Sequence, residues 1–112
     1  MAILAYALPV VPGQEDRLRR FPEELAAHQA DYEELNRLGT VRQHLAFLQA
    51  TPAGSLLITA FEVDDPSRLL RAFGDSAYDQ WWLDYLRDVN GVDVRSGPAA
   101  ALPELVFAWA AD

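Results

Sequence analysis

The chain contains no cysteine and no lysine, and each absence excludes a class of chemistry. Without cysteine there is no thiol nucleophile and no disulfide. Without lysine there is no Schiff-base catalysis, no attachment of pyridoxal phosphate and no P-loop. Neither GxSxG nor GxGxxG occurs, so the sequence lacks the signatures of a serine hydrolase and of a dinucleotide site. We therefore expect no cofactor, although either histidine would suit haem as an axial ligand.

Positive charge is also scarce. Nine arginines face 17 acidic residues, which gives a net charge of −8. The arginines are scattered, and the excess of negative charge repels phosphate backbones, so we expect no nucleic-acid partner. The apolar start of the chain lacks a basic region and is interrupted by Pro9, Pro12 and Gly13, which argues against a signal peptide or a membrane span. We expect a cytoplasmic protein that makes no membrane contact.

The apolar residues that are present suffice for one core, since 51% of the 112 residues are hydrophobic. No linker divides the chain, so residues 1–112 are predicted to form a single domain. Apolar and β-branched runs predict four strands. These strands are expected at residues 2–8, 41–50, 56–63 and 105–110.

Helical periodicity lies between the strands. A main helix is expected to follow a kink at a proline and to place its apolar stripe, with His28 and Tyr32, toward the core. A short helix and an aromatic-rich helix follow the third strand. The predicted boundary residues are Pro22 and Leu38–Gly39 for the first helix, Asp65–Pro66 for the second, and Ser76–Asp79 with Asn90–Gly91 for the third.

The order β-α-β-β-α-(α)-β predicts an α+β fold of the ferredoxin-like, split βαβ type, with a four-stranded antiparallel sheet and helices on one face. The free face of such a sheet normally alternates apolar with polar residues. Here the first, third and fourth predicted strands are apolar at nearly every position. A second copy of the sheet would cover that face, so we expect a homodimer through the sheet face, forming a closed or nearly closed barrel.

Several segments resemble the dimeric α+β barrel superfamily: ALPVVPG, YEELNRLG, FLQATPAGSLL and YDQWWLDYLRDVNGVD. This superfamily includes antibiotic-biosynthesis-type monooxygenases and tetracenomycin-type polyketide cyclases. The segments are most similar to one uncharacterised small bacterial family within it. That family's signature is a Pro-Phe-Asp-x-Trp-Phe run followed by His-Gly, whereas this chain has Ala77–Trp82 and then Asn90-Gly91, so it lacks that histidine.

The resemblance implies a substrate pocket between the sheet and the helices of each protomer. It selects His28, Tyr32, Trp82 and Tyr85 as wall residues. His28 is then the candidate general base, because histidine titrates near neutrality, and Glu24 one turn earlier would orient it. A buried structural histidine is the alternative for His28. The full set of predicted substrate-binding residues is Tyr6, His44, Phe47, Phe61, Tyr78, Trp81, Trp82, Tyr85 and Trp109, with His28 and Tyr32 as candidate catalytic residues.

These residues lead to two functional hypotheses. The first is a cofactor-independent natural-product tailoring enzyme, a cyclase or a monooxygenase, acting on a hydrophobic, aromatic or polyketide-like small molecule. The fold would orient the substrate, His28 would move a proton, and Tyr32 or the Trp82 indole would donate to the developing oxyanion. The second is a non-catalytic dimer that binds a metabolite or a partner protein. Two histidines without HxH or HxxxH spacing indicate no metal site.

Overall fold

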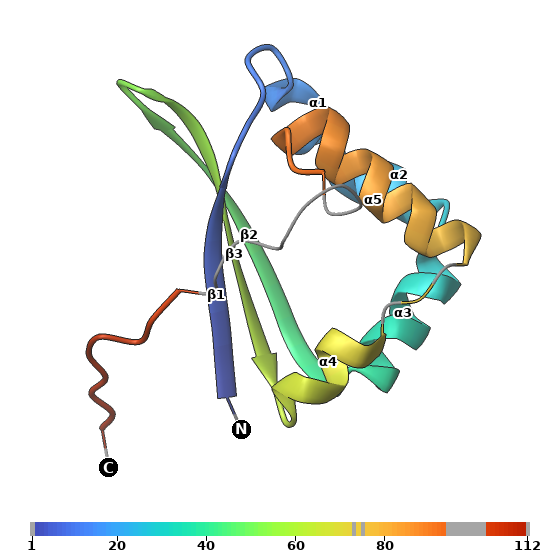
Figure 1. Cartoon of the computed structure of the whole chain (residues 1–112), viewed down its shortest axis with the longest axis vertical. Helices are drawn as coiled ribbons and strands as arrows, with labels where there is room; N and C mark the ends of the chain where they lie inside the picture. The colour runs from blue at the N-terminus through green and yellow to red at the C-terminus, as the bar shows by residue number, and fades with distance from the viewer. Residues whose placement is uncertain (1, 73, 75, 94–102, 112) are drawn as a thin grey trace.

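The computed structural model describes residues 2–72, 74, 76–93 and 103–111. In this part of the chain, three strands form one antiparallel sheet in the order β1-β3-β2, and helices cover one of its faces (Figure 1). The α+β class predicted from the sequence is confirmed. The strands are β1 (Ala2–Pro9), β2 (Val41–Thr51) and β3 (Gly54–Val63), and the helices are α1 (Glu15–Arg19), α2 (Phe21–Ala26), α3 (Gln29–Leu38), α4 (Pro66–Ala72) and α5 (Ala77–Asn90).

The register of the sheet decides which side chains face the helices. Thr59 of β3 lies between Tyr6 of β1 and Ala46 of β2, and this row points toward the helices. Because side chains alternate along a strand, the neighbouring row, with Ile58 and Phe47, points to the opposite face. Along β1, half-buried and exposed residues alternate without exception. One face of the sheet is therefore the wall of the core and the other is open.

The prediction of a fourth strand at residues 105–110 is wrong. Residues 103–111 form no strand or helix in the structure and run away from the body on the side of the sheet opposite the helices (Figure 1). Leu105 is 80% exposed and Trp109 is 79% exposed. A continuous apolar run predicts that the side chains of a segment become buried, but it does not specify the surface against which they are buried. The sheet of the described residues has three strands, not four.

The main helix is also shorter than predicted. The break near Pro22 is confirmed, because α1 ends at Arg19 and α2 carries the proline in its first turn. A second break, which we did not predict, separates α2 from α3. There His28 has a non-helical φ of −123° and occupies the N-cap position of α3 without a side-chain capping hydrogen bond. The apolar spacing continues across this break, so periodicity alone gives no sign of it.

The end of α3 differs from the expected arrangement in one further respect. Gly39 has an ordinary φ of −82°, and the left-handed conformation falls on Thr40, with φ 58°. Glycine is required at position 39 because α4 packs against it: an added Cβ would lie 2.8 Å from Leu69 Cδ1. The Thr40 hydroxyl accepts a hydrogen bond from the Asp65 amide at 2.9 Å, which ties the left-handed residue to the start of α4.

Both predicted ends of the aromatic helix are confirmed. At its start, the Ser76 hydroxyl accepts from the Asp79 amide and the Asp79 carboxylate accepts from the Ser76 amide, which is a complete capping box. At its end, Gly91 is left-handed, with φ 66°. These local signals depend on few residues, so they can be predicted without knowledge of the tertiary packing.

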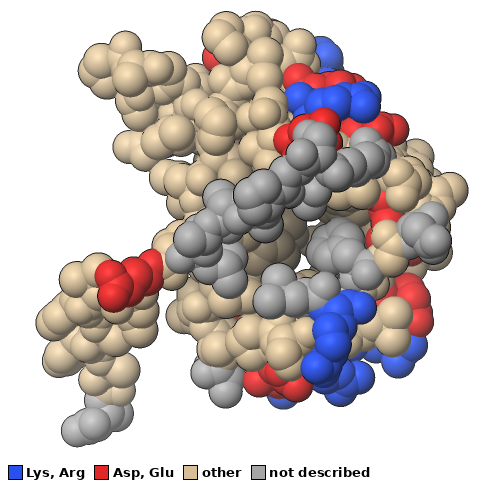
Figure 2. All heavy atoms as spheres, in the orientation of Figure 1, with Lys and Arg blue, Asp and Glu red and all other residues tan. Residues whose placement is uncertain are grey.

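Charged side chains are concentrated over the helices, as the visible face in Figure 2 shows. Arg17 pairs with Glu24 at 3.1 Å, and Arg42 of β2 pairs with Asp64 at 2.7 Å. The Arg17–Glu24 pair is half-buried, whereas the Arg42–Asp64 pair is exposed and contributes little to stability. Within the described ranges, no helix has both the length and the apolar character needed to cross a membrane.

Candidate functional site

A cavity of about 180 Å³ lies between the sheet and the helices. All three strands form its floor, and each of the five helices adds at least one residue to its wall. Leucines, Phe21 and Phe61 supply most of the lining. The hydrogen-bonding side chains in the lining are Tyr6, Tyr32, Asn36, His44, Thr59, Trp82, Tyr85 and Asn90.

Three of these side chains are joined in one hydrogen-bonded chain. The Tyr32 hydroxyl lies 2.8 Å from His44 Nδ1, and His44 Nε2 lies 2.9 Å from the Thr59 hydroxyl. Thr59 Oγ1 also lies 3.2 Å from the Leu45 carbonyl, to which it can donate its single hydroxyl proton. We assign the proton to this bond; the Thr59 oxygen then accepts from His44 Nε2, and the bare Nδ1 accepts the Tyr32 proton. We call these three side chains the hydroxyl–imidazole chain.

The position of His44 follows from the sheet. His44 and Thr59 point to the helix side from adjacent strands, and Tyr32 reaches His44 from α3. The imidazole stacks on Phe61, with ring centroids 4.1 Å apart and planes 16° apart. Burial lowers the pKa of His44 below the ordinary histidine value, because the charged form is poorly solvated there. His44 is thus a neutral proton acceptor at neutral pH.

Two further polar atoms of the cavity wall lack partners among the described residues: Tyr85 Oη and Asn90 Oδ1. Both residues are buried, with 2% and 1% exposure. The amide nitrogen of Asn90 donates to the Pro9 carbonyl at 2.8 Å, which fixes the side chain and leaves its oxygen free to accept. Burial, with the nearby Glu24 carboxylate, raises the pKa of Tyr85 to about 12, so this hydroxyl stays protonated. A buried polar group without a partner costs about 1–3 kcal/mol.

Rings of α2, of α5 and of the residue before α3 form an aromatic cluster beside the cavity, made of Phe21, His28, Tyr78, Trp81 and Trp82. The His28 and Trp81 centroids are 4.3 Å apart, and Phe21 stacks on Trp81 at 6.4 Å. The Trp82 indole donates to the Tyr78 hydroxyl. Burial raises the pKa of Tyr78 to about 12. Within the cluster the Trp82 indole thus has a partner, and the contacts of Phe21 with Trp81 and Trp82 join α2 to α5.

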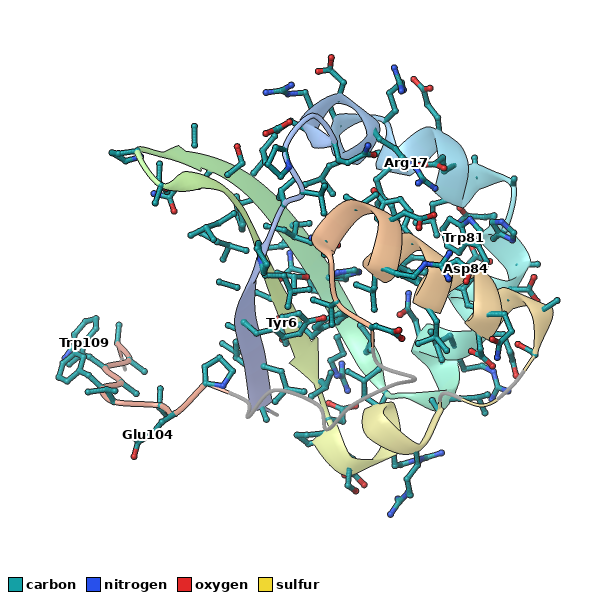
Figure 3. The ribbon with its side chains drawn as sticks, turned by 45° about the horizontal axis from the view of Figure 1, so that its top comes forward. Tyr6, Arg17, Trp81, Asp84, Glu104 and Trp109 are labelled. Atoms are coloured by element: carbon teal, nitrogen blue, oxygen red, sulfur yellow. The ribbon has the colours of Figure 1, made fainter. Side chains whose placement is uncertain are left out.

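The structure divides the predicted site residues into two groups. Figure 3 shows Tyr6 directed from β1 into the space beneath the helices and Trp109 far out on the exposed segment. Glu24, expected to orient His28, is paired with Arg17. The predicted residues that line the cavity are Tyr6, Tyr32, His44, Phe61, Trp82 and Tyr85, and those outside its lining are His28, Phe47, Tyr78, Trp81 and Trp109.

Sequence reasoning missed three polar residues of the cavity: Thr59, Asn36 and Asn90. Thr59 carried a usable signal, because it is the one hydroxyl between Leu56 and Val63 and shares the strand period of Phe61. Asn90 was predicted only as a helix end. Nothing in the spacing of Asn36 distinguishes it from a solvent-facing residue.

Metal chemistry finds no support in the described part of the chain, where no three His, Asp or Glu side chains come together as a ligand set. No model of a known protein family matches the chain, and no curated protein is significantly similar to it. The cavity and its hydroxyl–imidazole chain are therefore the observations that bear on function.

Proposed function

We propose that the protein is a cofactor-independent acid–base enzyme that acts on a small, hydrophobic aromatic molecule held in the cavity. The observation that carries this proposal is the hydroxyl–imidazole chain of Tyr32, His44 and Thr59, which lies in the wall of an otherwise largely apolar cavity. A neutral histidine whose unprotonated nitrogen accepts a hydrogen bond from a hydroxyl can take up the proton of that hydroxyl. A cavity filled only with hydrocarbon would have no use for such an arrangement.

The lining indicates the class of ligand. None of the described lining residues is charged, so the ligand is neutral. The volume of about 180 Å³ is close to that of apolar cavities that bind a single aromatic ring, which favours a ligand of one or two rings. Tyr85 Oη and Asn90 Oδ1 lie beneath the surface of the wall, so they do not specify groups of the ligand. A small enolisable aromatic ketone meets the requirements of volume and neutrality.

The proposed chemistry is proton transfer next to a carbonyl. A proton leaves a carbon atom of the ligand for Tyr32 Oη, as the hydroxyl proton of Tyr32 passes to His44 Nδ1. The resulting imidazolium still donates from Nε2 to the Thr59 oxygen, and the Thr59 hydroxyl still donates its own proton in a hydrogen bond to the Leu45 carbonyl. The electron pair of the broken C–H bond forms the enolate, and reversal of these transfers protonates it at another position or after ring closure. This series of proton transfers needs no oxidant and no cofactor.

Proton transfer of this kind favours the cyclase form of the tailoring hypothesis over the monooxygenase form, which would also have to reduce oxygen. The resemblance to the dimeric α+β barrel superfamily is part of the same proposal. It is supported by the order of the strands and helices from β1 to α5. The cytoplasmic location remains a prediction from the sequence.

The proposal can be tested by hydrogen exchange into a model ligand. The probe is 2-tetralone, a two-ring aromatic ketone with enolisable C–H bonds, incubated with the protein in D₂O and followed by ¹H NMR. We expect the protein to accelerate loss of the α-proton signals above the buffer rate. Tyr32→Phe and His44→Gln should each reduce that acceleration by about 10²-fold or more, the usual contribution of a general base.

Two controls separate catalysis from binding. His28→Gln removes the histidine outside the cavity lining and should leave exchange unchanged. Ala46→Phe places a ring in the cavity and should abolish both exchange and the quenching of tryptophan fluorescence by the probe. Saturable quenching by 2-tetralone without any exchange would contradict the enzyme and favour the non-catalytic metabolite-binding module instead. Exchange that survives in Tyr32→Phe and His44→Gln would remove the proposed base.

A further inference from the structure

Two apolar surfaces lie uncovered on the same side of the molecule. The first is the outward face of the sheet, where Ile3 is 74% exposed, Leu45 43% and Phe47 55%. The second is the segment 103–111, hereafter the tail, in which Phe107 is 80% exposed and Trp109 is 79% exposed. Large exposed apolar surfaces of this kind mark interaction sites.

The outward face is built from rows of small and branched apolar residues. Ala5, Ala60 and Leu45 form one row across the three strands. Ala7, Ile58 and Phe47 form the next. Polar residues are confined to the flanking rows, which contain Gln43, Glu62 and Gln49. The centre of the face is therefore a flat apolar platform with a polar border, which is the composition of an interface core and its rim.

The charge distribution favours a second copy of the chain as the occupant of this platform. The net charge of −8 would oppose association of two copies through the helices, where the acidic side chains lie. The two central rows of the platform hold no charged residue, and the tail has one carboxylate between residues 103 and 111, that of Glu104. Two copies that meet at these surfaces keep most of their negative charge apart.

The tail is not used by its own chain. Its described residues lie on the outward side of the sheet (Figure 1), and Figure 3 shows Glu104 and Trp109 well separated from the sheet and the helices. Leu105, Phe107 and Trp109 occupy alternate positions of the tail, so they would share one side if the tail became extended against a partner surface. In the present structure each of these side chains is at least 79% exposed and available to a surface outside its own fold.

We propose that the tail of each copy lies on the outward sheet face of a second copy, so that two chains exchange tails reciprocally in a homodimer. Each Phe107 or Trp109 ring buries about 150–250 Å² when it is covered. The four rings of a symmetric pair therefore supply roughly half of the ~1,600 Å² that a stable interface buries. The platform and the rest of the tails supply the remainder. This arrangement identifies the contacts of the homodimer expected from the sequence, and it does not depend on the chemistry proposed for the cavity.

The absence of cysteine allows a direct test by cross-linking. Ala60→Cys places a thiol on the platform, and Leu105→Cys places one on the row of large tail residues. Full-length chains that carry one substitution each are mixed and treated with a short bismaleimide. We expect the mixture to give a heterodimer joined between positions 60 and 105, identified by mass spectrometry of the linked peptides. In a chain carrying both substitutions at high dilution, a link formed only within one chain would assign the tail to its own sheet and overturn the proposal.

The oligomeric state supplies a second, independent measurement. We expect analytical ultracentrifugation to show a dimer, and the double variant Phe107→Asp with Trp109→Asp to raise its Kd at least about tenfold, as loss of a central aromatic anchor does. Phe47→Asp, on the platform, should have the same effect. Leu38→Asp is the matched control, since Leu38 is an exposed leucine at the end of α3, and it should leave Kd unchanged. A monomer at all concentrations, or a dimer insensitive to the tail and platform substitutions, would overturn the proposal.

Discussion

Tyr32 Oη and His44 Nδ1 lie 2.8 Å apart, and the direction of the proton in this bond is decided by Thr59, which is in contact with only one of them. Thr59 has a single hydroxyl proton, which we assign to the hydrogen bond with the Leu45 carbonyl. In this assignment the Thr59 oxygen accepts the His44 Nε2 proton, and Nδ1 accepts from Tyr32. A backbone carbonyl in β2 then determines which tautomer His44 presents to the cavity.

The first prediction concerns this dependence on Thr59. Thr59→Val keeps the shape of the side chain but removes the acceptor of His44 Nε2 and the donor to the Leu45 carbonyl. Because buried polar groups lose their partners, the free energy of unfolding should fall by about 1–3 kcal/mol in urea titrations. Thr59→Ser keeps the hydroxyl and should retain the Nε2-protonated tautomer, which the ¹⁵N shifts of the imidazole report. The opposite tautomer in the unmodified protein would contradict the assignment.

The second prediction concerns pH. Burial holds the pKa of His44 in the folded protein below its value in the unfolded chain, so the unfolded chain binds a proton first as the pH falls. Stability should therefore be fully present above about pH 6.5 and decrease as the pH falls toward 5. The urea midpoint should depend less on pH across this range in His44→Gln than in the unmodified protein. His28→Gln is the matched control. If the decrease in stability were lost in His28→Gln and not in His44→Gln, the effect would belong to His28.

The third prediction concerns the contact of α3 with α4. Gly39→Ala adds a Cβ that would lie 2.8 Å from Leu69 Cδ1 and 3.1 Å from the Leu35 carbonyl oxygen. Overpacking of this degree should destabilise the protein by about 1–3 kcal/mol. In a Leu69→Ala background the side-chain clash is relieved, so the same substitution should cost less. A double-mutant cycle of urea-derived free energies measures the difference, and additive costs would show that Leu69 does not restrict position 39.

The fourth prediction ranks the two residues of the capping box. The Asp79 carboxylate accepts from the Gly74 amide at 3.1 Å, the Ser76 amide at 3.2 Å and the Ser76 hydroxyl at 2.7 Å, whereas the Ser76 side chain makes two bonds, both to Asp79. Loss of a helix cap costs about 0.5–2 kcal/mol. We expect Ser76→Ala to fall in this range and Asp79→Ala to exceed it in thermal or urea unfolding. An equal cost for the two variants would mean that the Gly74 contact contributes nothing.

The sequence predicted those features that depend on neighbouring residues. The capping box of Ser76 and Asp79, the left-handed Gly91 and the hairpin between β2 and β3 each arise within a few positions of the chain. The helix break at His28 could not be found in this way. It preserves the apolar spacing on both sides, and the ring that His28 contacts, Trp81, is far along the chain.

The candidate site was predicted in part for the same reason. Tyr32 and Trp82 face the cavity because helical periodicity places them on the inward side. The partnership of His44 with Tyr32 and Thr59 depends on the strand register and on the packing of α3 over the sheet, which no local pattern specifies. The fate of the tail depends on a surface outside the segment itself, and an apolar composition alone could not reveal it.

Two hydrogen bonds join the exit of β1 to the last turn of α5. The Val11 amide donates to the Val89 carbonyl at 2.7 Å, and the Asn90 side chain donates to the Pro9 carbonyl at 2.8 Å. A chain growing from its N-terminus on the ribosome holds β1 without its sheet neighbour β3 until Val63 has been made, and without this clamp until Asn90 has been made. The cavity is therefore assembled late in synthesis, and the apolar first strand must be kept from other chains until β3 emerges.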